Sequence, residues 1–169
     1  MTPDEALQQF RRIALGRALG RHVGSDRLIQ LGLDALLAGV ESPSLAMLAG
    51  LVRGEEPEAP GLFDQVLWEL DLSVEVPDDP RAAQWALAYW AAEQIVDGTL
   101  DPTAGAWLIW YDVAYALGYP KALEPLGHCA LLLDSWDEGW STAFESLERD
   151  TIQAAREFLG TRPPGDRRD

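Results

Sequence analysis

Basic residues are scarce in the middle of this chain. Between residues 28 and 148, only Arg53, Arg81 and Lys121 stand against twenty-one acidic side chains. The other ten basic residues are arginines near the two ends, and the whole chain carries a net charge of −15. Nucleic acids and anionic membrane surfaces attract proteins mainly through lysine and arginine. The composition therefore disfavours both as partners.

Cysteine and histidine are also nearly absent. Cys129 is alone, which excludes a disulfide within the chain, and one cysteine with two histidines does not make the usual kind of zinc site. His128 precedes Cys129 directly, so on a helix the two side chains point about 100° apart and cannot act as base and nucleophile. The Gly-x-Ser-x-Gly motif and the phosphate-binding glycine patterns are missing. We therefore expect no catalytic residue, no metal and no cofactor.

Long apolar runs are lacking as well. No stretch approaches the roughly 20 residues of a membrane-spanning helix. The first residues do not resemble the apolar core of a secretion signal, because Asp4, Gln8 and Arg11 interrupt them. These absences predict a cytoplasmic protein.

Helix start signals are abundant. Thr2, with a proline after it and Glu5 three residues on, predicts a capped first helix, and Ser42-Pro43 predicts another. Asp79-Pro80 and Asp101-Pro102 predict two long helices, which end near Val96 and Leu117. No stretch alternates polar and apolar residues as a strand does. Further helices are predicted over 25–37, 62–70, 123–136 and 138–159.

The expected fold is all-α, with about seven or eight helices. A hydrophobic fraction of 47% and seven tryptophans can supply one substantial core. The sequence predicts a single domain over 1–160, followed by a flexible tail at 161–169. The helices 80–96 and 102–117 are apolar almost all round, which predicts that they form a central hairpin rich in Trp and Tyr.

Acidic side chains form two candidate contact surfaces. If one helix covers 138–159, the first surface is a stripe that continues from the preceding helix. Its members are Asp134, Glu138, Glu145 and Glu148. The second surface is the loop that carries Glu55, Glu56 and Glu58. Such faces attract a basic protein surface and accelerate its association.

An aromatic-lined pocket is the alternative site. Asp112 lies mid-helix among apolar residues, and burial would raise its pKa and make it a proton donor or acceptor. A helix face turned to solvent is the other interpretation of the same position. The proposed lining consists of Trp85, Tyr89, Trp107, Trp110, Tyr111 and Asp112.

Seven stretches of the chain resemble a family of small acidic all-helical actinobacterial proteins. These stretches are 31–45, 48–51, 55–59, 95–98, 108–110, 117–120 and 134–140. The resemblance covers most of the chain but contains no motif with a chemical mechanism behind it. It implies a soluble bacterial protein that works through contacts, and it assigns no catalytic residue.

Three hypotheses about function follow. The first is a non-enzymatic interaction module, similar to an immunity or antitoxin protein or an accessory regulator, that binds a basic protein partner. The second is a small helical enzyme or ligand-binding protein that uses the aromatic pocket near Asp112. The third is mimicry of nucleic-acid charge. The many tryptophans also suggest a homodimer.

Overall fold

The computed structural model describes residues 1–162, and within them it contains helices and no strand. The all-α prediction is confirmed. The π-helical segment at 108–114 continues one helix into the next, so these residues form eight helices together with two short 3-10 turns. Residues 163–169, most of the predicted flexible tail, lie outside the described part of the chain.

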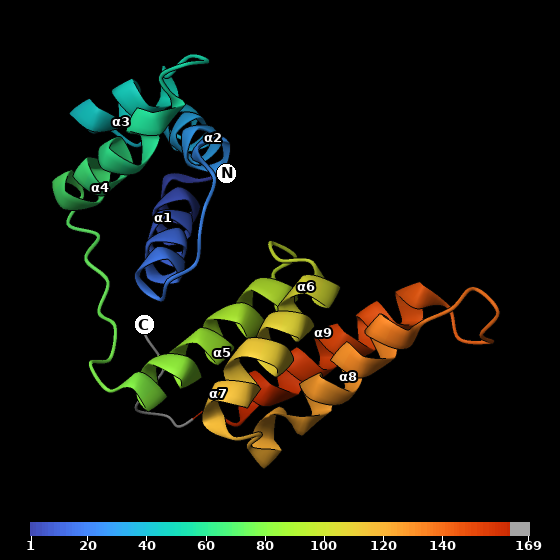
Figure 1. The fold of residues 1–169 in the computed structure, drawn as a ribbon. Coiled ribbons are helices and arrows are strands. Elements are labelled where there is room, and N and C mark those ends of the chain that lie inside the picture. Colours follow the sequence, from blue (N-terminus) through green and yellow to red (C-terminus); the bar gives the residue numbers. More distant parts are fainter. Residues whose placement is uncertain (163–169) are drawn as a thin grey trace. The chain divides into compact units, whose positions relative to one another are not determined.

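Contacts between residues divide the chain into two compact units, Met1–Val76 and Pro77–Asp169 (Figure 1). The sequence predicts one domain over 1–160, and that extent stays a prediction. Each unit has its own buried side chains and is described by itself.

The first unit consists of four helices and one 3-10 turn. They are α1 (Pro3–Ala18), α2 (Ser25–Leu37), α3 (Pro43–Ala49), η1 (Glu56–Glu58) and α4 (Ala59–Glu69). The predicted capping box starts α1: Thr2 Oγ1 accepts from the Glu5 amide at 3.2 Å, and Glu5 Oε2 accepts from the Thr2 amide at 2.7 Å. The core of this unit includes Phe10 and Phe63, whose rings stack with centroids 5.1 Å apart.

A carboxylate from another helix, rather than Ser42, caps α3. Glu69 at the end of α4 accepts from the Ser44 amide at 3.0 Å and from the Ser44 hydroxyl at 2.6 Å, and the Ser42 hydroxyl also donates to it. The Ser42 side chain therefore points its hydrogen at Glu69 and does not accept from the first turn of α3. This contact ties α3 to α4.

The second unit holds the other four helices. They are α5 (Pro80–Val96), the continuous run of α6 (Pro102–Trp107), η2 (Leu108–Ala114) and α7 (Tyr115–Leu117), then α8 (Glu124–Ser135) and α9 (Phe144–Gly160), with the turn η3 (Lys121–Leu123) before α8. Both predicted caps are present, since Asp79 accepts from the Ala82 amide at 2.8 Å and Asp101 from the Ala104 amide at 3.0 Å. Helices α5 and α6 approach closely because Gly105 has no side chain and lies against Ile95.

One helix boundary predicted from the sequence is wrong. The last helix begins at Phe144 and not at residue 138. Residues 136–143 form the loop that joins α8 and α9 (Figure 1), where Trp136 Nε1 donates to the Thr142 carbonyl at 3.0 Å and the Gly139 amide donates to Asp137 at 2.8 Å. These local hydrogen bonds offer the backbone partners outside a helix. No helix within 1–162 is both long and apolar enough to cross a membrane.

Candidate interaction surfaces

The predicted acidic contact residues do not form one continuous stripe. Asp134 lies on α8, Glu138 in the following loop, and Glu145 on α9; all three are exposed. Glu148 on α9 is half-buried. The stripe depended on a helix that covers 138 to 159, and the late start of α9 breaks it.

The second acidic group belongs to the other unit. Glu55, Glu56 and Glu58 are exposed on and beside η1, as their loop position predicts. Glu55 also accepts from the Val52 amide at 3.2 Å, which closes the turn before η1. These carboxylates are available to a partner as a local patch.

The six residues of the predicted aromatic pocket fall into different settings. Trp85 and Tyr89 turn inward on α5 and stack on Phe158 of α9, with the Tyr89 and Phe158 ring centroids 4.8 Å apart. Arg162 covers the Tyr89 ring at 4.7 Å and binds Glu93 at 2.8 Å. This part of the hairpin is a packed stack.

The other members of the predicted pocket lie along the run from α6 to α7, and three of them are exposed. Trp107, Tyr111 and Asp112 face outward, as does the neighbouring Tyr115, which is 70% exposed. Tyr119, just beyond α7, is 51% exposed. We call these five residues the tyrosine surface.

Packing beneath this surface holds it in place. Trp110 lies directly against Gly127 of α8, where even an added methyl group would overlap the indole ring. The Trp110 ring in turn supports Tyr119, with centroids 5.1 Å apart, and Tyr119 meets Tyr115 edge-on at 6.3 Å. Ring contacts therefore hold Tyr115 and Tyr119 in place.

The backbone of the tyrosine surface is unusual in two respects. The segment η2 has the i→i+5 hydrogen bonds of a π-helix, which are rare and frequently occur at functional sites. Tyr119 has a φ of 56°, a left-handed conformation that costs a residue with a side chain roughly 1–2 kcal/mol. Such backbone deviations cluster where a protein binds or reacts.

Asp112 does not meet the condition that an enzymatic role required. That role depended on a buried side chain, and the Asp112 side chain is exposed. The thiol of Cys129, in the second unit, is buried, and burial raises its pKa, away from the reactive thiolate. Within residues 1–162 no three His, Cys, Asp or Glu side chains gather as metal ligands.

Sequence reasoning missed two features of these surfaces. The first is the spacing of Trp107, Tyr111, Tyr115 and Tyr119, one aromatic ring at every fourth position, which is visible in the sequence. The second is Trp68 at the end of α4 in the first unit, which is 85% exposed. No pattern around Trp68 predicts its exposure, because α4 is apolar on several sides.

No family model matches this sequence, and the comparisons with curated proteins and with solved structures also found no match. The resemblance to the small actinobacterial proteins therefore stays a prediction.

Proposed function

We propose that this chain is a non-enzymatic interaction module that binds a basic protein surface, in the manner of an immunity or antitoxin-like protein or an accessory regulator. The observation that carries the proposal is the tyrosine surface, where four aromatic rings and the carboxylate of Asp112 are exposed together on a chain of net charge −15.

Aromatic side chains on a surface favour a protein partner. Tyr and Trp are enriched among the residues that dominate binding energy in protein interfaces, since they bury large areas at little entropic cost. Soluble proteins rarely expose such groups in a cluster without a use. The tyrosine surface thus supplies the contact that the acidic patches alone would lack.

The acidic side chains steer the partner toward the contact surface and accelerate its association. Exposed carboxylates such as Asp134, Glu138 and Glu145 attract a basic partner and raise its association rate, with little effect on the strength of the final contact. We assign Glu55, Glu56 and Glu58 the same role in the first unit. Arginine is the matching group on the partner, because it pairs with carboxylates and stacks on aromatic rings.

Affinity capture from the source organism tests the proposal. We expect the wild-type chain to retain a protein with a basic surface at low ionic strength and to release much of it near 1 M salt, where charges are screened beyond about 3 Å. Identification of the captured protein and measurement of its affinity at several salt concentrations complete the test. A failure to bind any protein at low salt, or binding that salt does not change, would contradict the proposal.

A pair of variants separates contact from charge. Replacement of Tyr111 and Tyr115 by alanine removes two exposed rings and is expected to weaken binding by at least roughly 30-fold, the effect of losing a hot-spot contact of about 2 kcal/mol. Trp140→Ala removes an aromatic ring of similar exposure, in the loop between α8 and α9, and should leave affinity unchanged. If Trp140→Ala weakened binding as much as the double tyrosine variant did, the result would argue against the tyrosine surface as the contact.

A further inference from the structure

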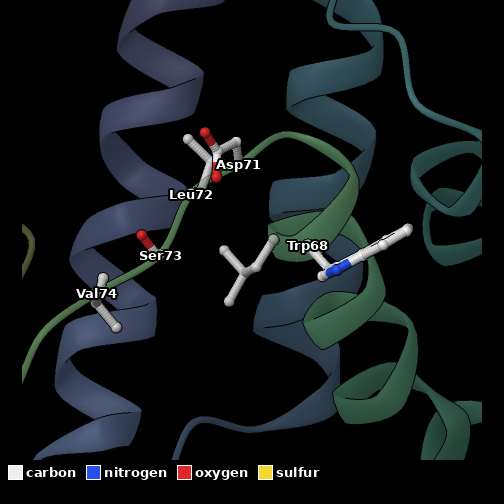
Figure 2. A pocket seen from close by; sticks show the side chains of 6 residues that line it. Trp68, Asp71, Leu72, Ser73 and Val74 are labelled. Atoms are coloured by element: carbon white, nitrogen blue, oxygen red, sulfur yellow. The ribbon is translucent and has the colours of Figure 1, made fainter.

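The end of α4 carries a second surface that the tyrosine surface does not include. An open hollow of about 230 Å³ lies between the last turn of α4 and the segment that follows it (Figure 2). Its lining consists of Leu67, Trp68, Asp71, Leu72, Ser73 and Val74. Sites for drug-sized ligands measure roughly 300–1,000 Å³. This hollow has the size for one side chain.

The chemistry of the lining defines what it accepts. Leu67, Leu72 and Val74 offer apolar walls, and the Trp68 indole projects away from the helix (Figure 2). Asp71 contributes the one charged group of the lining. An occupant with an apolar stem, a flat cationic end and hydrogen-bond donors would match the apolar walls, the indole ring and the carboxylate of the lining. These are the properties of an arginine side chain.

The chain already holds two of its own arginines in this way. Arg17 lies over the Phe63 ring at 5.1 Å and binds Asp64 at 2.6 Å. Arg162 is placed between Tyr89 and Glu93, over the ring at 4.7 Å and against the carboxylate at 2.8 Å. In each case an aromatic ring and a carboxylate at most four residues apart hold one guanidinium group.

Trp68 and Asp71 are a third pair of this kind, three residues apart, and no cation of residues 1–162 lies on them. Asp71 is also one of the two non-glycine residues of the described chain with a left-handed backbone, at φ 53°. Asp71 lies two residues beyond the end of α4, and its amide donates to the Trp68 carbonyl at 3.3 Å. Trp68 and Asp71 thus both line one hollow.

We infer that the Trp68 hollow binds an arginine side chain of the basic protein partner, with the guanidinium stacked on Trp68 and paired with Asp71. The inference rests on the proposed function and adds a second contact, in the other unit of the chain. Burial of an 85% exposed indole against a partner gives the hollow the aromatic anchor that interfaces use.

A peptide titration followed by NMR tests the inference on the full chain. The probe is a capped hexapeptide with one arginine between two valines, and its matched control carries citrulline, which has the same shape without the charge. The Trp68 indole signal of the ¹⁵N-labelled protein is identified by its absence in Trp68→Phe. We expect the arginine peptide to shift this signal and the amide signals of residues 67–74 until saturation, and the citrulline peptide to bind at least about fivefold more weakly.

Variants of the hollow complete the test. Trp68→Ala and Asp71→Asn should each weaken binding about fivefold or more, whereas Glu41→Gln, an exposed change outside the hollow, should not. Trp68 is too exposed for its loss to unfold the protein, and asparagine tolerates the left-handed backbone of Asp71.

Four results would overturn the inference. Equal binding of the citrulline peptide would show that the hollow does not recognise the positive charge of arginine. Shifts confined to other acidic surfaces would show that the arginine binds elsewhere. Shifts of the Trp68 signal on concentrating the protein without peptide would assign the hollow to a second copy of the chain. Capture of a basic protein that is unaffected by Trp68→Ala would refute the hollow while the proposed function stood, and a failure of all capture would refute the proposed function itself.

Discussion

The non-glycine residues with left-handed backbone each lie beside an exposed aromatic ring. Within residues 1–162 they are Asp71, three residues after Trp68, and Tyr119, which contacts Tyr115. Each conformation costs roughly 1–2 kcal/mol, less for aspartate than for tyrosine.

Glu69 shows how a single residue couples stability to pH. The hydroxyls of Ser42 and Ser44 and the Ser44 amide donate to its carboxylate and hold its pKa below the ordinary value of 4.5. The folded chain therefore binds this proton less readily than the unfolded chain does. The resulting stabilisation is complete above pH 4.5 and is lost as the pH falls through the pKa of the folded state.

We expect Glu69→Gln to lower the melting temperature at pH 7 and to do so progressively less as the pH falls below 4.5 and through the pKa of the folded state, because the wild-type carboxylate then becomes protonated too. Thermal melts followed by circular dichroism at a series of pH values measure the difference. Glu56→Gln, at an exposed side chain outside this cluster, serves as the control. A constant difference between Glu69→Gln and wild type across this range would show that the carboxylate is not the titrating group.

At the scale of elements, the helix from Pro102 to Leu117 determines where the tyrosine surface lies. Its inner side packs Ile109 and Val113 without exposure, and its outer side carries the tyrosine surface. The π-helical hydrogen bonds wind the chain less tightly than an α-helix does. Aromatic residues four positions apart therefore stay closer to one face through η2.

The contact between Trp110 and Gly127 is the element-scale test. Gly127→Ala places a methyl group inside the volume of the indole and is expected to destabilise the second unit by roughly 1–3 kcal/mol, the usual range for overpacking. Gly160→Ala, at the open end of α9, adds the same methyl group without any neighbour within 4 Å. Urea unfolding of both variants gives the free energies.

The same pair of variants reports on the tyrosine surface. Displacement of Trp110 removes the support of Tyr119, so Gly127→Ala should also weaken partner binding, whereas Gly160→Ala should leave it unchanged. If Gly127→Ala were as stable as wild type, the result would contradict the close contact between Trp110 and Gly127.

At the scale of the whole molecule, the division into two units matters most. The first unit has a core of its own, with Phe10, Phe63 and Leu45 fully buried. Proteins of its length, 76 residues, lie near the lower limit of what a hydrophobic core can stabilise without disulfides or metals, and many of them do fold alone.

We expect residues 1–76, expressed separately, to be helical and to unfold in one cooperative thermal transition. Far-ultraviolet circular dichroism and calorimetry measure both properties, and residues 77–169 can be tested in parallel. A fragment without a cooperative transition would instead support the single domain over 1–160 that the sequence predicts.

Local signals in the sequence determined the secondary structure of this protein. Thr2, Asp79 and Asp101 cap the helices that they predict, because a cap depends on residues within one turn of each other. The order and type of nearly all elements followed. The start of α9 did not follow, since contacts of Trp136 with the loop decided it.

Tertiary structure decided which aromatic side chains are exposed. Trp85 and Trp107 occupy similar positions on similar helices, yet the first stacks on Phe158 of α9 and the second faces solvent. The difference arises from which neighbouring helix covers each face, and that depends on residues far away in the chain. Composition could thus predict an acidic protein that binds a basic partner. The tyrosine surface and the Trp68 hollow depend on how the helices pack, and the sequence alone did not predict them.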